Sequence, residues 1–405
     1  MLRSMLKVTL QIKSPKGATL IMSHPVIVGA GPLGLMAALA LGNHFDKVTL
    51  IGPDAPKDGR TTAILNEGVD FLGSLGVWEK LENKTAPLKV MRIVDGTKRL
   101  IRAPEARFDS SELNADCFGH NVKNQDLLKA LNETIKSHSN IKRLKIPAIS
   151  VEFDNEAKAS ITLANDTVLN TDLLVATDGR NSMVRSAAGI QTTQWSYPQI
   201  AMVMNLSHTR DHDFISTEFH TESGPFTLVP LPDNNSSLVW VEKPDEAQKI
   251  LDLPLTELAN RISEKSHYLL GDVTIKTKPM AYPLSGLTAE EFGKGSVVLV
   301  GESAHVFPPI GAQGMNLGIR DIKALSECLT QQSSGHNSTE TSLSDQYSKA
   351  RRTDITVRTK AVDTLNRSLL TDMLPVHLGR GIGLYALNSF PFFRKFVMKR
   401  GLSAE

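Results

Sequence analysis

Three glycine-bearing stretches carry the residue types that could hold a ligand against the main chain. The first, Gly29–Gly34, has the letters GAGPLG and is a G-x-G-x-x-G motif. The second, Asp178–Arg185, is DGRNSMVR, and the third, Gly301–Asp321, is GESAHVFPPIGAQGMNLGIRD. Glycine lets the backbone approach a ligand closely, and a helix N-terminus after such a turn favours an anionic or electron-rich group. The stretches therefore indicate ligand binding rather than a catalytic triad or a carboxylate pair, neither of which we find.

The first stretch stands where a strand is expected to pass into a helix. The apolar run Pro25–Gly29 predicts the strand, and the alanine- and leucine-rich run Leu35–Leu41 predicts the helix. In this setting Gly29 permits a tight turn, Gly31 lets the backbone approach a pyrophosphate, and Gly34 allows close helix–strand packing. The context favours dinucleotide binding, with an ordinary strand–loop–helix crossover as the alternative.

The acid that commonly binds the ribose of a dinucleotide is missing from its expected place. It is expected about twenty residues after the glycines, near the end of the next predicted strand, Lys47–Ile51. Gly52 stands there, and Asp54 follows two residues later. Two possibilities stay open: Asp54 reaches the ribose, or the contact is lost.

The second and third stretches each follow an apolar run that predicts a buried strand. Asp178 and Gly179 follow Asp172–Thr177, and Gly301 follows Ser296–Val300. An aspartate and a glycine at the carboxyl end of a strand are the usual address of a ligand in an open α/β sheet. Asp178 also suits an ordinary helix N-cap, and it can serve both purposes.

Composition places the chain of 405 residues among globular proteins. A formal net charge of +2 does not suggest nucleic acid as a partner. Cys117 and Cys328 form no CxxC pair, which favours reduced thiols in the cytoplasm and disfavours a zinc or other metal site. No run approaches the roughly 18 apolar residues of a membrane span.

Changes of pattern along the chain predict five segments. These are a basic N-terminal extension at 1–21, the first part of a nucleotide-binding domain at 22–190, an inserted antiparallel sheet at 191–289, the second part of the nucleotide-binding domain at 290–345, and a helical region at 346–405. Apolar periodicity predicts helices at Ile64–Leu81, at Asn121–Leu131 with a start within NVKNQDLL, and at Asp321–Leu329. The tail at 374–400 is basic and rich in phenylalanine, which suits either an anionic membrane surface or packing on its own domain.

Taken together, the three glycine stretches resemble those of the class A flavoprotein monooxygenases, the group typified by p-hydroxybenzoate hydroxylase. In that group the first stretch binds the FAD diphosphate, the second serves FAD and NAD(P)H together, and the third binds the ribityl chain and pyrimidine edge of the flavin. The finer resemblance is to the ubiquinone-biosynthesis hydroxylases. It rests on GRTTAILNEGVDFLGSLGVWEKL from Gly59, FGHNVKNQDLLKAL from Phe118, GPFTLVPLPDNNSSLVW from Gly224 and GAQGMNLGIRD from Gly311.

Site residues follow from this resemblance position by position. The implied cofactor-binding residues are Gly29, Gly31, Gly34, Arg60, Asp178, Gly179, Glu302, Gly311, Gly314, Met315 and Asn316. The implied residues of the reacting region are Pro308, Pro309 and His305. Glu302 replaces the aspartate that is usual in the family and is one methylene longer. His305 is a candidate general base, with a structural role as the favoured alternative.

The resemblance implies an α/β fold with a Rossmann-like FAD-binding domain, an inserted antiparallel-sheet substrate domain and C-terminal helices. It implies FAD as cofactor, NADH or NADPH as co-substrate, and O2, with a flavin C4a-hydroperoxide that is attacked by an aromatic carbon. The expected substrate is a polyprenylated phenol of ubiquinone biosynthesis. Other proteins of that pathway and a membrane surface at the C-terminus are the further expected partners, and the cytoplasm is the expected location.

Three alternatives stay open. One is a class A hydroxylase that acts on a small soluble phenol. A second is an inactive flavin-binding subunit of a biosynthetic assembly, which the departures at Gly52 and Glu302 keep in play. A third is a flavin-dependent prenyl reductase, which fits the GAQGMNLGIRD segment less well.

Overall fold

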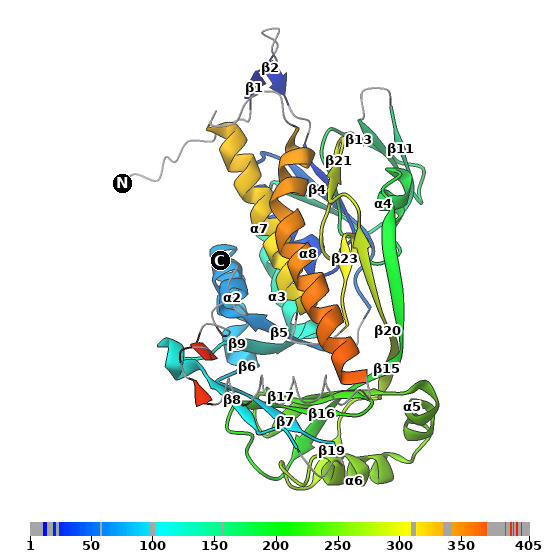
Figure 1. Cartoon of the computed structure of the whole chain (residues 1–405). Helices are drawn as coiled ribbons and strands as arrows, with labels where there is room; N and C mark the ends of the chain where they lie inside the picture. Colours follow the sequence, from blue (N-terminus) through cyan, green and yellow to red (C-terminus); the bar gives the residue numbers. More distant parts are fainter. Residues whose placement is uncertain are drawn as a thin grey trace.

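Two sheets organise the molecule, and long helices cover the smaller one (Figure 1). The computed structural model describes residues 11–13, 19–21, 24–56, 59–97, 102–154, 158–308, 313–334 and 342–370, with residues 385, 389, 390, 392, 394, 395 and 398. In Figure 1, α7 and α8 run side by side along the smaller sheet. Helices α5 and α6 cover the side of the larger sheet that faces away from α7 and α8. The predicted α/β fold class is confirmed.

The smaller sheet is parallel apart from one edge strand. Its order is β10 (Ile141–Leu144), β4 (Val48–Ile51), β3 (Val26–Val28), β14 (Leu174–Ala176), β22 (Val297–Leu299) and the antiparallel β21 (Gly293–Lys294). The four strands from β4 to β22 are buried throughout, as expected for parallel strands covered on both faces. The principal helices of this part are α1 (Pro32–Gly42), α3 (Asn124–Lys136), α7 (Gln313–Ser333) and α8 (Leu343–Leu370).

The larger sheet is mainly antiparallel. Along its main path lie β23 (His305–Val306), β20 (Met280–Ala289), β15 (Thr192–His208), β18 (Asn235–Glu242), β17 (Gly224–Leu231), β16 (Ile215–Thr221), β7 (Val90–Asp95) and β8 (Ala106–Asp109), with β19 (Val273–Ile275) paired to β15. Helices α5 (Pro244–Leu251) and α6 (Leu255–Lys265) pack on one face. Strands β7, β8 and β23 come from outside the predicted insertion at 191–289, so the sheet joins three segments of the chain. The predicted division into domains stays a prediction.

Shorter elements complete the fold. They are the hairpin β1 (Gln11–Lys13) and β2 (Thr19–Ile21), the sheet β5 (Thr61–Leu65), β9 (Gly119–Lys123) and β6 (Thr85–Pro87), the sheet β11 (Ala148–Phe153), β12 (Ala159–Leu163) and β13 (Val168–Thr171), helices α2 (Asn66–Ser74) and α4 (Met183–Ala187), and the 3-10 turns η1 (Trp78–Lys80), η2 (Glu82–Lys84), η3 (Ser110–Leu113) and η4 (Gly301–Ser303). Within the described ranges, no helix is long and apolar enough to cross a membrane.

Two predicted helix boundaries are wrong. Ile64 and Leu65 end strand β5 instead of beginning a helix, because both pair with strand β9. Helix α3 begins at Asn124, directly after strand β9 and inside the segment NVKNQDLL in which its start was predicted. Helix α7 begins at Gln313, eight residues before Asp321, so its N-terminus lies inside the third glycine stretch.

Candidate cofactor-binding site

The parallel sheet brings the three glycine stretches to one edge. Val28 pairs with Ala176, and Ala176 pairs with Leu299, so strands β3, β14 and β22 end together. The backbone N–H of Thr177 donates to the Val28 carbonyl at 2.8 Å, and that of Val300 donates to the Ala176 carbonyl at 2.9 Å. Because each stretch begins just after these bonds, residues far apart in sequence form one ligand-binding edge.

The glycines at this edge divide into two groups. A Cβ on Gly29 would lie 2.2 Å from the Thr177 carbonyl oxygen, and one on Gly34 would lie 1.9 Å from the Gly29 carbonyl oxygen. These two glycines therefore let the chain pack on itself. A Cβ on Gly31, Gly179 or Gly314 would meet no described atom within 4 Å. These three open positions, one from each stretch, leave room for a ligand beside the backbone.

Asp178 lies at this edge with its side chain partly buried. Its Oδ2 accepts the Val184 backbone N–H at 3.1 Å, whereas its Oδ1 has no hydrogen-bond partner among the described residues. Burial raises the pKa of Asp178, since desolvation disfavours the charged carboxylate. A ligand hydroxyl that donates to Oδ1 would compensate for this desolvation. The acid and the open glycines fit a cofactor such as FAD, which carries both phosphates and hydroxyl groups.

Helix α7 presents its first turn at the same edge. Gly314, Met315 and Asn316 lie in this turn, where backbone N–H groups have no intrahelical partner. The Asn316 side chain is occupied: Oδ1 accepts the Leu65 N–H at 2.9 Å, and Nδ2 donates to the Ala63 carbonyl at 2.8 Å. Asn316 therefore ties α7 to strand β5 and leaves the backbone of the turn to face a ligand.

The other predicted site residues occupy varied positions. Glu302 is exposed within η4, and Pro308 is buried two residues after the end of β23. Pro309 and Gly311 lie outside the described residues. Arg60 precedes β5, and its guanidinium carbon stands 5.8 Å from the centre of the Tyr282 ring on the larger sheet. Their roles stay predictions.

Gly52 and Asp54 lie where an acid that binds the ribose of the cofactor is expected. Gly52 has a φ of +135°, which suits glycine and not an acidic residue. Asp54 pairs with Lys145 at 2.6 Å and with Arg143 at 3.2 Å. Arg143 also donates to the Gly52 carbonyl at 2.9 Å. The carboxylate of Asp54 is thus held beside the end of β10, and any contact with a ribose stays a prediction.

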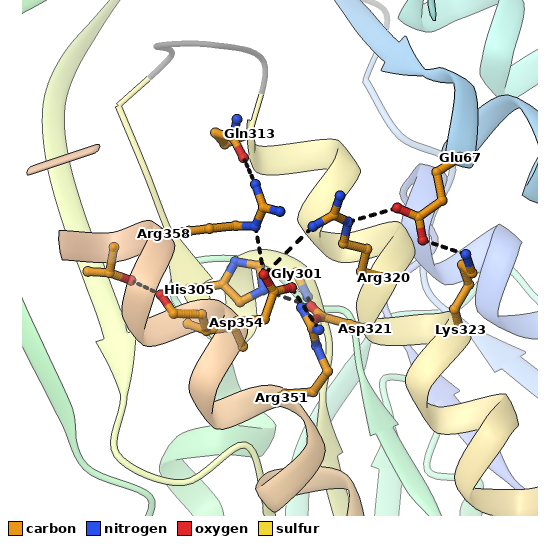
Figure 2. Close-up of polar contacts among 12 residues, drawn as sticks. Glu67, Gly301, His305, Gln313, Arg320, Asp321, Lys323, Arg351, Asp354 and Arg358 are labelled. Atoms are coloured by element: carbon orange, nitrogen blue, oxygen red, sulfur yellow. Dashed lines mark hydrogen bonds and ion pairs between the residues drawn. The ribbon is translucent and has the colours of Figure 1, made fainter. Parts of the chain in front are cut away.

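His305 belongs to the third stretch and lies next to Asp321 (Figure 2). Its side chain and that of Asp321 are both 0% exposed, and His305 Nε2 lies 2.7 Å from Asp321 Oδ2. Asp321 also accepts the Gly301 N–H at 2.9 Å and Arg351 Nε at 2.7 Å. Burial opposes ionisation of Asp321, but His305 and Arg351 outweigh it and lower the pKa of the carboxyl. This geometry favours the structural role of His305 over the role of general base.

The charged cluster continues outward from Asp321 to the start of α7 (Figure 2). Asp354 pairs with Arg351 at 3.0 Å and with Arg358 at 2.7 Å. Arg358 Nη1 donates to Gln313 Oε1 at 3.2 Å, at the first residue of α7. On the other side of α7, Glu67 of α2 pairs with Arg320 at 3.1 Å. Helix α8 and α2 therefore hold α7 and its N-terminal turn in place.

The sequence-based reasoning missed Asp321 as a member of the site. It counted Asp321 only as the last residue of the third stretch and the first residue of a helix. A signal was present: Leu317 and Leu325 lie four residues to either side, so Asp321 falls on the buried face of an amphipathic helix. A carboxylate on such a face requires a partner, and Arg351 and His305 supply it.

The parallel sheet and the ligand-binding edge formed by the three glycine stretches define an FAD-binding protein. Comparison with known families supports this conclusion. The model of the FAD binding domain family matches residues 23–362. Because this match spans most of the chain, the chain belongs to that family. The sequence-based identification of the class and of FAD as cofactor is confirmed.

Curated relatives match nearly the whole chain. Ubiquinone hydroxylase UbiL of Rhodospirillum rubrum is 29% identical over 388 residues, which cover 93% of this chain and 89% of the relative. The 3-demethoxyubiquinol 3-hydroxylase of Escherichia coli is 27% identical over 387 residues, covering 93% and 97%. Among solved structures, p-nitrophenol 4-monooxygenase from Pseudomonas putida shares the fold, with a TM-score of 0.76, 19% identity, and coverage of 94% of this chain and 98% of that one.

Proposed function

We propose that the protein is an FAD-dependent monooxygenase that uses NAD(P)H and O2 to hydroxylate the ring of a polyprenylated phenol in ubiquinone biosynthesis. The observation that carries the proposal is the similarity to ubiquinone hydroxylases along nearly the whole chain. The ligand-binding edge of the parallel sheet supports the proposal, because it fits the cofactor that such a reaction requires. This edge has open positions at Gly31, Gly179 and Gly314.

Residues of this chain would hold the cofactor by its polar groups. The N–H groups that begin α1 and the open backbone at Gly31 suit the diphosphate, and Asp178 Oδ1 suits a hydroxyl group. The first turn of α7 suits an electron-rich edge of the ring. When bound, the flavin supplies the redox and oxygen-transfer chemistry, and the protein supplies position and exclusion of water.

The larger sheet would hold the aromatic ring of the substrate. Val203, Val229 and Val239 lie on the face opposite α5 and α6, and all three keep accessible surface. An apolar surface beside the cofactor protects a reactive oxygen donor from water. This arrangement suits a phenol with an apolar substituent better than a small charged phenol.

The experiment is to purify the protein, record its visible absorption spectrum and then measure NAD(P)H oxidation. We expect flavin bands at about equal stoichiometry, because the family is FAD-binding, and oxidation stimulated by a 2-prenylphenol more than by unsubstituted phenol. Equal stimulation by the two would favour the hydroxylase of small phenols. A colourless protein that takes up no added FAD would favour the inactive subunit.

We also propose that the C-terminal tail contacts a membrane surface. Among its described residues, Phe392 is 86% exposed and Phe390 is 61% exposed. Arg394 pairs with Glu112 at 2.9 Å, which ties the tail to the turn after β8. Exposed aromatic rings beside basic residues suit an anionic bilayer surface, where a polyprenylated substrate resides.

A further inference from the structure

The two faces of the larger sheet have different surroundings. Phe219 of β16 is buried against Phe226, with ring centres 5.9 Å apart, in the core that includes residues of α5 and α6. Side chains alternate along a strand, so the neighbours Glu218 and His220 point to the opposite face. Figure 1 shows that this opposite face is turned toward the part of the molecule that carries α7 and α8.

Polar contacts show that this face meets the FAD-binding part. Asn205 Nδ2 donates to the Gly59 carbonyl at 2.8 Å, next to Arg60. Arg60 in turn lies over the Tyr282 ring at 5.8 Å. Residues that pair across neighbouring strands form a row across the sheet. One such row contains Glu218, Thr227, Val239 and Val203. On the same face, Asn205 lies in the neighbouring row on one side, and Ala201 with its partner Tyr282 lies in the neighbouring row on the other side. The row of Glu218 therefore lies between the two contacts with the FAD-binding part.

The row combines accessible apolar surface with one carboxylate. Val203, Val239, Thr227 and Glu218 are partly exposed, whereas the residues flanking each of them in its strand are buried. Strands β15 to β18 and β20 contain two carboxylates, Glu218 and Glu242. Glu242 lies on the other face, where its Oε1 accepts Trp240 Nε1 at 3.1 Å. Glu218 is therefore the one acid that these strands direct to the FAD-binding part.

The Glu218 carboxylate is held in position and still accessible. His220 Nε2 lies 2.7 Å from Glu218 Oε1, and Thr227 Oγ1 donates to Glu218 Oε2 at 3.2 Å. The side chain of His220 is 6% exposed and that of Glu218 is 19% exposed. His220 Nδ1 has no hydrogen-bond partner in the described parts of the chain. Each carboxylate oxygen keeps capacity for a further hydrogen bond.

We propose that Glu218 is the group that accepts the proton of the substrate's phenolic hydroxyl, with His220 as the residue that positions it. This inference rests on the proposed function. The phenol O–H bond breaks, its proton passes to Glu218 Oε2, and the electron pair stays on the substrate oxygen and increases the electron density of the ring. The ring carbon then forms a C–O bond with the outer oxygen of the donor as the O–O bond of the donor breaks. The proton that this carbon loses when the ring becomes aromatic again passes to the oxygen that leaves. The proton returns from Glu218 when the product phenol forms, so the carboxylate is regenerated.

The test compares Glu218→Gln with the matched control Glu242→Gln on the opposite face. The probes are 2-prenylphenol and a ring-fluorinated analogue whose hydroxyl is more acidic. We expect kcat of Glu218→Gln with 2-prenylphenol to fall about 100-fold, with the flavin spectrum and Tm retained, because a positioned base contributes roughly that factor. The more acidic phenol should recover about tenfold of the loss, since it depends less on the base. Glu242→Gln should keep its kcat.

The double variant tests the role of His220. If His220 acts through Glu218, then Glu218→Gln with His220→Leu should lose no more activity than Glu218→Gln alone. A Glu218→Gln enzyme with near wild-type kcat, or with an equal loss for both phenols, would overturn the inference and leave the proposed function standing. A flavin-loaded wild-type enzyme that hydroxylates neither phenol would overturn both.

Discussion

At the scale of the residue, Asp178 is the most direct probe of cofactor binding. Its Oδ1 is buried with no hydrogen-bond partner among the described residues. We predict that Asp178→Ala weakens FAD binding by about 10- to 100-fold, because a charged hydrogen bond contributes roughly 1.5–3 kcal/mol. Asp178→Asn, which keeps an acceptor oxygen, should lose less. Titration of the apoprotein with FAD, followed by flavin fluorescence, measures both, and equal affinity of Asp178→Ala and wild type would contradict the assignment.

Gly31 and Gly34 should respond differently to the same substitution. Gly34→Ala places a Cβ 1.9 Å from the Gly29 carbonyl oxygen, so we expect a lower Tm even without FAD. Gly31→Ala meets no described atom within 4 Å, so the apoprotein should keep its Tm but lose FAD affinity as the methyl group fills space meant for the cofactor. Thermal melts with and without FAD separate the two effects. Unchanged FAD affinity in Gly31→Ala would argue against a diphosphate at this position.

At the scale of the element, helices α7 and α8 are joined by a buried carboxylate. Asp321 binds Arg351 at 2.7 Å and lies 2.7 Å from His305. We predict that Asp321→Asn lowers the free energy of unfolding by about 3–5 kcal/mol, because it leaves Arg351 buried without its anion. The exposed Asp70 of α2 offers a control, and Asp70→Asn should change little. Urea unfolding of the apoproteins measures the difference.

The contribution of Asp321 should depend on pH. Burial disfavours its ionised form, but His305 and Arg351 outweigh burial, so the folded pKa lies below the ordinary value of 3.8. The carboxylate therefore stabilises the fold fully above that ordinary value, and this stability is lost as the pH falls through the lower, folded pKa. The gap in unfolding free energy between wild type and Asp321→Asn should narrow in that acid range. A difference in unfolding free energy that stays constant over this acid range would contradict the stabilising role of the Asp321 carboxylate.

The elements also show what could be predicted from the sequence. The strands at Val26–Val28, Leu174–Ala176 and Val297–Leu299 are short and wholly apolar, so the parallel sheet and its ligand-binding edge were predictable. The start of α7 was not, because Gly314 and Gly318 weaken the local helical signal that tertiary packing overrides. Strand β16 pairs with β7, which lies more than a hundred residues earlier in the chain, so local patterns could not give the position of Glu218 in the larger sheet.

At the scale of the whole molecule, the tail is predicted to bring the enzyme to its substrate. We expect deletion of residues 390–405 to shift the protein from liposomes to the soluble fraction while FAD stays bound. The double variant Phe390→Ser with Phe392→Ser removes only exposed rings and should also lower binding to vesicles containing anionic lipid. Sedimentation with such vesicles measures the partition. Unchanged partition of both variants would exclude the tail as the membrane contact.

The central claim is that one edge of the parallel sheet binds FAD and one face of the larger sheet holds a prenylated phenol for hydroxylation. The most direct measurement is mass spectrometry of the product that the FAD-loaded protein forms from a 2-prenylphenol, NAD(P)H and isotopically labelled O2. We predict a ring-hydroxylated phenol that carries one labelled oxygen atom. Consumption of NAD(P)H with only hydrogen peroxide as product, and no label in the phenol, would contradict the claim.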